Sequence, residues 1–169
     1  MRTVAVLALL LAVALVYTAM WRGWRARAAR QADLPALPAP PVATSSVLPD
    51  GPVEASYVGT SAAGVWLDRM VAQGLGRRGN AVVDVTTDGV LIERAAPDSA
   101  LWLPRGALRE VRRDRGVAGK ATFEAEGLLV LTWAHGDRVL DSGLRLRHAA
   151  DAPVVQDAVQ SLLTSGERS

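Results

Sequence analysis

The chain has no cysteine and only two histidines among its 169 residues. The missing thiols exclude disulfide bonds, thiolate nucleophiles and cysteine-ligated metal sites. His135 and His148 are not spaced i, i+4 on one helix face, and no cysteine can join them, so the sequence predicts no metal site. We expect His135, which lies in a turn, to be solvated.

Motifs of common catalytic sites are also missing. No GxSxG elbow is present, and the carboxylates are scattered without a spacing that pairs them. Residues 74–79 satisfy GxGxxG, but a strand pattern follows where a dinucleotide site needs a helix. Residues 116–121 match a phosphate loop only loosely, because the spacing is short and Ala121 replaces the magnesium-binding Ser or Thr. The sequence therefore predicts no cofactor and no enzyme activity.

The excess of basic over acidic residues is confined to the N-terminal region. The net charge is +2, yet residues 1–30 carry five arginines and no acidic residue. Residues 55–169 carry 14 basic and 14 acidic side chains, so the larger part of the chain is neutral. Because the basic excess is confined to residues 1–30, we predict no nucleic-acid partner.

One long apolar run is present, at residues 3–21, and it contains no charge, proline or glycine. As a helix with a rise of ~1.5 Å per residue, these 19 residues would be about 28 Å long, close to the hydrocarbon thickness of a bilayer. We therefore predict a single-pass transmembrane helix that contacts the lipid bilayer through residues 3–21. An export signal is the alternative, although its apolar core is usually only ~7–15 residues long.

A basic flank follows the apolar run and sets its predicted orientation. It consists of Arg22, Arg25, Arg27 and Arg30, whereas only Arg2 precedes the run. Positive residues favour the cytoplasmic side of a membrane. We therefore expect residues 1–30 to form a plasma-membrane anchor with its N-terminus outside, which places the soluble domain in the cytoplasm. The four arginines could in addition select anionic lipid.

Residues 31–54 contain six prolines and read as a linker. Such a composition favours extended polyproline geometry and does not build a core. We expect a spacer that holds the following domain tens of Å from the bilayer. The alternative, a ligand for a proline-recognition module at residues 38–41, has less support.

Residues 55–165 show mainly strand patterns. Runs rich in Val and Ile at residues 81–86 and 90–94 flank Asp88-Gly89, which predicts a tight hairpin. Residues 128–134 and 138–146 predict a second hairpin across residues 135–137. Residues 101–103 predict a short strand that Pro104 ends.

Three further stretches are less regular. A strand begins at residues 56–58, and we expect Gly59 to end it. Residues 65–71 fit either a strand or a helix face. Leu108 and Val111 are spaced i, i+3, as in one helical turn or an irregular edge.

The chain closes with an amphipathic helix predicted over residues 152–164. Asp151 is a plausible N-cap, and Pro153 lies in the first turn, where its missing N–H costs little. An apolar stripe runs along the helix through Val154, Val155, Ala158, Val159, Leu162 and Leu163. Six or seven short strands with such a helix predict a bent antiparallel sheet or partly open barrel that the helix plugs.

Several local stretches resemble those of small bacterial, actinobacterial-type membrane proteins with a pleckstrin-homology-like (PH-like) domain. They are Tyr57-Val58-Gly59-Thr60, Trp66-Leu67-Asp68-Arg69, Asp88-Gly89-Val90-Leu91, Leu101-x-Leu103-Pro104 followed by Leu108-x-x-Val111, Asp114-Arg115-Gly116-Val117-Ala118-Gly119-Lys120, and Arg147-His148-Ala149-Ala150-Asp151. The resemblance implies a seven-stranded bent barrel capped by a C-terminal helix. It supplies no functional residues.

One basic group lies within the domain. It consists of Arg105, Arg109, Arg112, Arg113 and Arg115, with Glu110 and Asp114 interleaved. Guanidinium groups suit phosphate or carboxylate ligands, such as anionic lipid head groups, but the interleaved acids also fit a self-paired solvated face.

Our first hypothesis is therefore a membrane-tethered, non-enzymatic PH-like module at the inner face of the membrane. It would bind or scaffold an unknown protein partner by strand addition at a sheet edge or in the groove beside the helix. The alternative is binding of an anionic lipid or small anion through residues 105–115.

Overall fold

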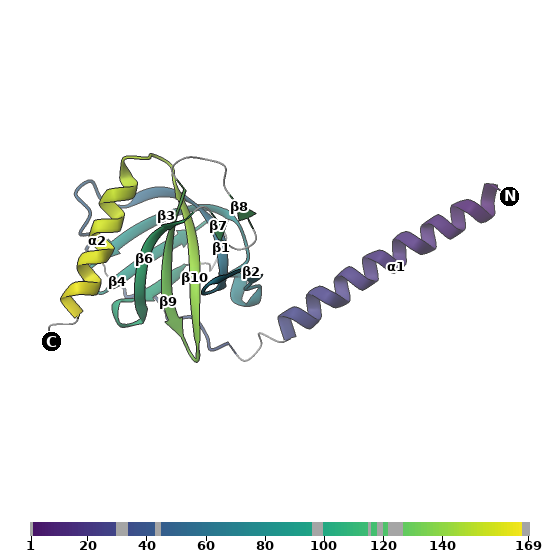
Figure 1. Cartoon of the computed structure of the whole chain (residues 1–169), viewed down its shortest axis with the longest axis horizontal. Helices are drawn as coiled ribbons and strands as arrows, with labels where there is room; N and C mark the ends of the chain where they lie inside the picture. The colour runs from purple at the N-terminus through teal and green to yellow at the C-terminus, as the bar shows by residue number, and fades with distance from the viewer. Residues whose placement is uncertain are drawn as a thin grey trace. The chain divides into compact units, whose positions relative to one another are not determined.

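The computed structural model of the chain describes residues 2–29, 34–42, 45–95, 100–114, 116–117, 120–121 and 127–166. The chain divides into two units, Met1–Asp33 and Leu34–Ser169. The first unit contains one helix, α1 (Arg2–Ala29), drawn in purple in Figure 1. Within the described ranges, no helix combines the length and the apolar character of a membrane span.

The second unit is a mainly-β domain with an antiparallel sheet and a C-terminal helix, as predicted (Figure 1). The strands of the sheet are β1 (Val53–Ala62), β2 (Val65–Arg69), β3 (Gly79–Thr86), β4 (Gly89–Arg94), β5 (Leu101–Pro104), β6 (Leu108–Asp114), β9 (Leu128–His135) and β10 (Arg138–Leu146). Their order is β5-β4-β3-β1-β10-β9-β6, with β2 paired to β1.

The remaining elements are short apart from the last helix. The 3-10 helices η1 (Ala72–Gly74) and η2 (Arg105–Ala107) precede β3 and β6. A separate two-stranded sheet joins β7 (Gly116–Val117) to β8 (Lys120–Ala121). The helix predicted over residues 152–164 is α2 (Asp151–Gly166).

The core fills the concave side of the sheet, and α2 covers it. Alternate residues point inward, so that Val83 and Ile92 pair across β3 and β4 and are fully buried. The two end strands, β5 and β6, are not paired to each other. Helix α2 packs against β6, η2, β3 and β4 and buries Val155, Val159 and Leu162. The helix therefore closes the side that the sheet leaves open.

Both predicted hairpins are confirmed. In the first, Thr86 pairs with Gly89, so the turn residues are Thr87 and Asp88 rather than Asp88 and Gly89. Gly89 is needed because a Cβ there would lie 2.2 Å from the carbonyl oxygen of Leu103. In the second hairpin, His135 pairs with Arg138.

The irregular stretches are all strands. Gly59 does not end β1, which continues to Ala62 after a bulge between Tyr57 and Gly59. Residues 65–69 form β2. Leu108 and Val111 both lie in β6, where the register shifts between Leu108 and Glu110. A bulge adds one residue to the strand, so two inward side chains can be three positions apart, which imitates a helical spacing.

The prediction for residues 31–54 misses their packing. Leu34 and Leu48 are only 7% and 5% exposed and belong to the core cluster. Val47 N–H donates to Val85 O at 2.8 Å, and Ser46 forms a bridge with Thr86. Proline removes backbone donors but does not stop an intervening leucine from being buried. The domain therefore begins at Leu34, well before the predicted residue 55, and the segment is not a free spacer.

Replacing Leu48 by Ala should lower the free energy of unfolding by about 2–4 kcal/mol, because a buried leucine leaves a cavity. The matched control is Val42→Ala, since Val42 belongs to the same proline-rich segment and is fully exposed. Urea unfolding of the full chain in mild detergent, followed by tryptophan fluorescence, measures both changes. Equal, negligible losses in the two variants would show that the segment does not stabilise the domain.

Candidate functional site

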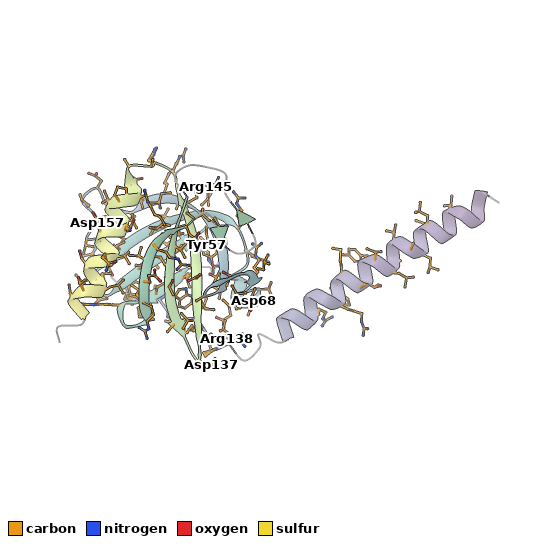
Figure 2. All side chains as sticks on the ribbon, in the orientation of Figure 1. Tyr57, Asp68, Asp137, Arg138, Arg145 and Asp157 are labelled. Carbon is orange, nitrogen blue, oxygen red and sulfur yellow. The ribbon has the colours of Figure 1, made fainter. Side chains whose placement is uncertain are left out.

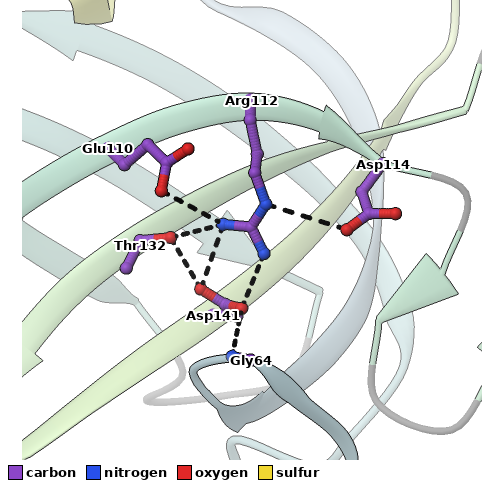
Figure 3. A network of polar contacts seen from close by, with 6 residues as sticks. All are labelled: Gly64, Glu110, Arg112, Asp114, Thr132 and Asp141. Atoms are coloured by element: carbon purple, nitrogen blue, oxygen red, sulfur yellow. Dashed lines mark hydrogen bonds and ion pairs between the residues drawn. The ribbon is translucent and has the colours of Figure 1, made fainter.

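Three neighbouring strands share a polar network on the outer face of the sheet (Figure 3). Arg112 of β6 contacts Asp141 of β10 with Nη2 2.7 Å from Oδ2. Thr132 of β9 lies between them: its hydroxyl accepts from Arg112 at 2.6 Å and donates to Asp141 Oδ1 at 2.6 Å. The backbone N–H of Gly64 donates to Asp141 Oδ2 at 3.2 Å. The network thus joins β6, β9 and β10 to the turn between β1 and β2.

The network controls the charge of its members. The side chain of Asp141 is 5% exposed and that of Arg112 is 29% exposed. Burial alone would raise the pKa of Asp141, but hydrogen bonds from Arg112, Thr132 and Gly64 outweigh it and hold the pKa below its usual value. The hydrogen bond to Asp141 raises the pKa of Arg112. Both groups are therefore charged at neutral pH, and the guanidinium is largely neutralised by its carboxylate.

The other arginines of the 105–115 cluster do not converge on one ligand site. Arg105 Nε donates to the carbonyl oxygen of Leu162 at 3.1 Å and so joins η2 to α2. Arg109 donates to the carbonyl oxygens of Gly106 and Leu108 at 2.7 and 3.0 Å. Arg113 is exposed, and Arg115 lies outside the described residues. Three of the four described arginines are thus already bonded within the domain.

The membrane-flanking arginines are described in part. Arg22 and Arg25 belong to α1, and the Arg25 guanidinium lies 4.6 Å from the ring centroid of Trp21. The side chain of Arg27 and the whole of Arg30 lie outside the described residues.

A groove runs between β6 and α2 and has a volume of about 540 Å³. It is lined by Arg105, Gly106, Leu108, Arg109, Glu110, Gln160, Leu162, Leu163 and Thr164. Strand β6 ends the sheet and pairs only with β9, so its outer edge has no strand partner in the described part of the chain. An unpaired edge beside a groove can accept a further strand, because backbone groups and side-chain space are available together.

A second groove, which the sequence patterns did not indicate, has a volume of about 570 Å³ and crosses β10, β1, β3 and β4. Its lining contains both acidic and basic side chains, and two of them, Arg147 and Glu54, form an ion pair. Arg94, another lining residue, donates to Gly74 O at 2.8 Å and lies 5.2 Å from the Tyr57 ring centroid. This mixture of charges favours no one class of ligand.

The core contains a chain of polar side chains that sequence reasoning also missed. Trp133 Nε1 donates to Ser142 Oγ at 3.0 Å, and Ser142 and Thr60 share a hydrogen bond of 2.7 Å. The Tyr57 hydroxyl lies 2.5 Å from Thr60 Oγ1 and donates to Leu75 O at 2.9 Å. Burial raises the pKa of Tyr57. Each hydroxyl is thus satisfied, and the chain braces the barrel interior rather than preparing a nucleophile.

Two glycine-containing motifs occur in the sequence, at residues 74–79 and 116–121. Residues 74–79 connect η1 to β3, and residues 118–119 of the second glycine motif lie outside the described residues.

The prediction that His135 is solvated is wrong: it is 7% exposed, and its Nε2 lies 2.8 Å from Pro35 O. His148 is exposed just before α2. Among the described residues, no three His, Asp or Glu side chains gather as metal ligands would.

Comparison with known proteins gives one family match. A family model described as Bacterial PH domain-like matches residues 32–160. Among solved structures, the chain is similar to the C-terminal phosphotyrosine interaction domain of mouse APBB2, with 12% identity and a TM-score of 0.47. That likeness covers 76% of this chain and 95% of the mouse domain. No curated protein matches the chain.

Replacing Asp141 by Asn should lower the free energy of unfolding at pH 7 by about 2–3 kcal/mol, because the charge-assisted hydrogen bonds are lost. The pKa of Asp141 is lower in the folded than in the unfolded chain. Its stabilising contribution is therefore present above the unfolded pKa of about 3.9 and is lost as pH falls through the folded pKa.

The measurement is urea unfolding of both proteins between pH 7 and pH 2.5, where the difference in free energy of unfolding between wild type and Asp141→Asn should become smaller as the pH falls. Asp157→Asn, on an exposed position of α2, serves as the control and should follow the wild-type profile. A difference that stayed constant with pH would contradict the assigned role of the Asp141 charge.

Proposed function

The chain belongs to the Bacterial PH domain-like family, and on this basis we propose that it is a membrane-tethered, non-enzymatic module that binds a protein segment in the α2–β6 groove. The observation that carries the proposal is the unpaired outer edge of β6 beside a groove of about 540 Å³. A protein segment in extended conformation fits both features, because its backbone pairs with the edge and its side chains enter the groove.

The groove lining suggests the chemistry of that segment. Leu108 and Leu162 are buried residues at its base, and Leu163 is partly buried beside them. Arg105 and Arg109 line the same groove, each with only part of its guanidinium engaged in the bonds described above. An extended segment with an apolar side chain and a nearby carboxylate would complement this lining.

The tether is proposed from the sequence. Residues 3–21 of the full sequence are long enough and apolar enough for a span. The unbroken stretch of α1 whose side chains the structure describes, residues 9–23, is shorter than that run. The arginines that follow favour the cytoplasmic side. We place the N-terminus outside and the PH-like domain at the inner face of the plasma membrane.

Binding of an anionic lipid or small anion by residues 105–115 has less support. Arg112 is neutralised by Asp141, while Arg105 donates to Leu162 O of α2 and Arg109 donates to Gly106 O of η2. The described arginines of the cluster therefore do not converge on one head group, although Arg105 and Arg109 each keep guanidinium N–H groups that can meet a single carboxylate. The protein-binding proposal is therefore the stronger one.

The groove is tested with random peptides displayed on phage and selected on the full chain in nanodiscs. We expect Gln160→Trp, which fills the groove, to weaken binding of the selected peptides at least ~10-fold, or about 1.4 kcal/mol. Ser161→Trp, the next residue on α2 and outside the groove, is the matched control and should bind normally. Bound peptide should also slow hydrogen exchange of β6 amides.

Two results would count against the groove. One is the selection of peptides that bind both tryptophan variants as tightly as wild type. The other is a selection that yields no peptide, together with binding to anionic vesicles that high salt or Arg113→Glu abolishes, which would favour the lipid alternative.

The tether is tested by washing membranes of expressing cells with sodium carbonate at high pH. The full chain should stay in the pellet, whereas a variant with Leu9, Leu10 and Leu11 changed to Asp should be released, since charge at the centre of a span is costly. A reporter active only in the cytoplasm and fused after Ser169 should give signal. Release of the wild-type chain would contradict the tether, and a silent cytoplasmic reporter would contradict its orientation.

A further inference from the structure

The proline-rich segment joins the domain at one defined end. The side-chain amide of Gln73 donates to Leu34 O at 3.0 Å, and His135 Nε2 lies 2.8 Å from Pro35 O. Gln73 belongs to η1, which directly follows β2, and His135 is the last residue of β9 before the turn into β10. The point at which the chain joins the domain is therefore bracketed by the end of β2 and the start of β10.

The same end carries a group of exposed apolar side chains. Six large apolar residues are exposed among the described residues of this unit: Val42, Val47, Val65, Leu67, Val139 and Val154. Val65 and Leu67 of β2 have 52% and 67% of their surface exposed, and Val139, near the start of β10, is 45% exposed. Ala63 N–H donates to Val139 O at 2.9 Å, so the turn that leads into β2 lies beside the start of β10.

The connection to the proposed tether is short. Only residues 30–33 separate α1 from Leu34, and fully extended chain covers at most ~3.6 Å per residue, so Ala29 to Leu34 spans at most about 18 Å. The helical residues between Trp21 and Ala29 add about 12 Å at ~1.5 Å each. A free 24-residue spacer would instead reach roughly 70 Å at ~3.1 Å per residue. A short connection keeps the effective concentration of this end of the domain at the membrane surface high, so even a weak contact with the bilayer can form.

The charged residues around the apolar group are mixed, with a basic excess. Asp68 and Arg69 lie at the end of β2, and Asp137 and Arg138 lie at the turn into β10; Figure 2 labels Asp68, Asp137 and Arg138. Arg77 and Arg78 are exposed and follow Gly76, whose carbonyl oxygen accepts a hydrogen bond from Arg69. Exposed apolar residues flanked by basic ones suit the boundary between head groups and acyl chains.

We propose that β2 and the start of β10 form a membrane-docking surface, the apolar side chains of Val65, Leu67 and Val139 entering the bilayer interface. This inference rests on the proposed tether, because the short connection is what brings this end to the membrane. Helix α2 and β2 lie on opposite sides of the domain in Figure 1, so docking leaves the α2–β6 groove accessible.

The test uses single-cysteine variants of the full chain, which has no cysteine of its own. Leu67→Cys, Val139→Cys and the control Val154→Cys, an exposed valine on α2, each carry the fluorophore NBD in phosphatidylcholine vesicles. Labels at Leu67 and Val139 should be quenched by lipids with a doxyl group near the head group, and aqueous iodide should quench them at least ~3-fold less than the label at Val154.

A second variant separates docking from local misfolding. Val65→Asp, combined with the label at Val139, should raise iodide quenching to the level of the Val154 label while the cooperative unfolding of the domain is kept. Equal iodide quenching at all three sites, in vesicles from which carbonate does not extract the chain, would overturn the docking surface and leave the tether intact. Shielding from iodide without doxyl quenching would overturn it in favour of a protein contact. Extraction by carbonate would overturn the tether and the docking surface together.

Discussion

The sheet of this domain does not close, and much of the structure follows from that constraint. Within the described residues, its end strands β5 and β6 each pair on one side only, so the concave face would be open to water along the gap between them. Buried apolar area is the main favourable contribution to folding, and an exposed interior would forfeit it. Helix α2 covers the gap with Val155, Val159 and Leu162, and the proline-rich segment adds Leu34 and Leu48 to the same core.

The same gap explains why a groove lies between α2 and β6. A helix that packs over the end of a sheet covers the interior but does not pair with the edge strand, because helical backbone groups are already bonded within the helix. The outer edge of β6 therefore stays available beside α2, and Arg105 links the two elements by its bond to Leu162 O. The feature that stabilises the domain thus also leaves the surface that we assign to a protein partner.

Sequence patterns predicted the parts of the fold that depend on local chemistry. The turn residues between β3 and β4 and between β9 and β10, and the apolar stripe of α2, are local signals, and all three elements are present. The burial of Leu34 and Leu48 was missed because it depends on distant residues, among them Gln73 and His135. The Leu108–Val111 spacing was ambiguous because a bulge is decided by the partner strand.

The arginine cluster shows the same division between local and distant information. Its members are close in sequence, which suggests one anion site, but alternation along β6 and the register with β9 and β10 separate them. Arg112 contacts Asp141, which is 29 positions away in the chain, directly, and Thr132 on the intervening strand bonds to both. Composition cannot reveal such a partner, so the assignment of Arg112 to the fold and not to a ligand required the sheet order.

The proposed tether, groove and docking surface place separate demands on one small domain. A partner that adds a strand to β6 needs that edge to face away from the bilayer, while the proposed docking surface needs the β2 end to face toward it. Both demands are met together because η1 and the β9–β10 turn bind the incoming chain at the end that carries β2. A long free spacer would leave the domain without a preferred orientation, so under the proposed tether the burial of Leu34 and Leu48 would orient the domain as well as stabilise it.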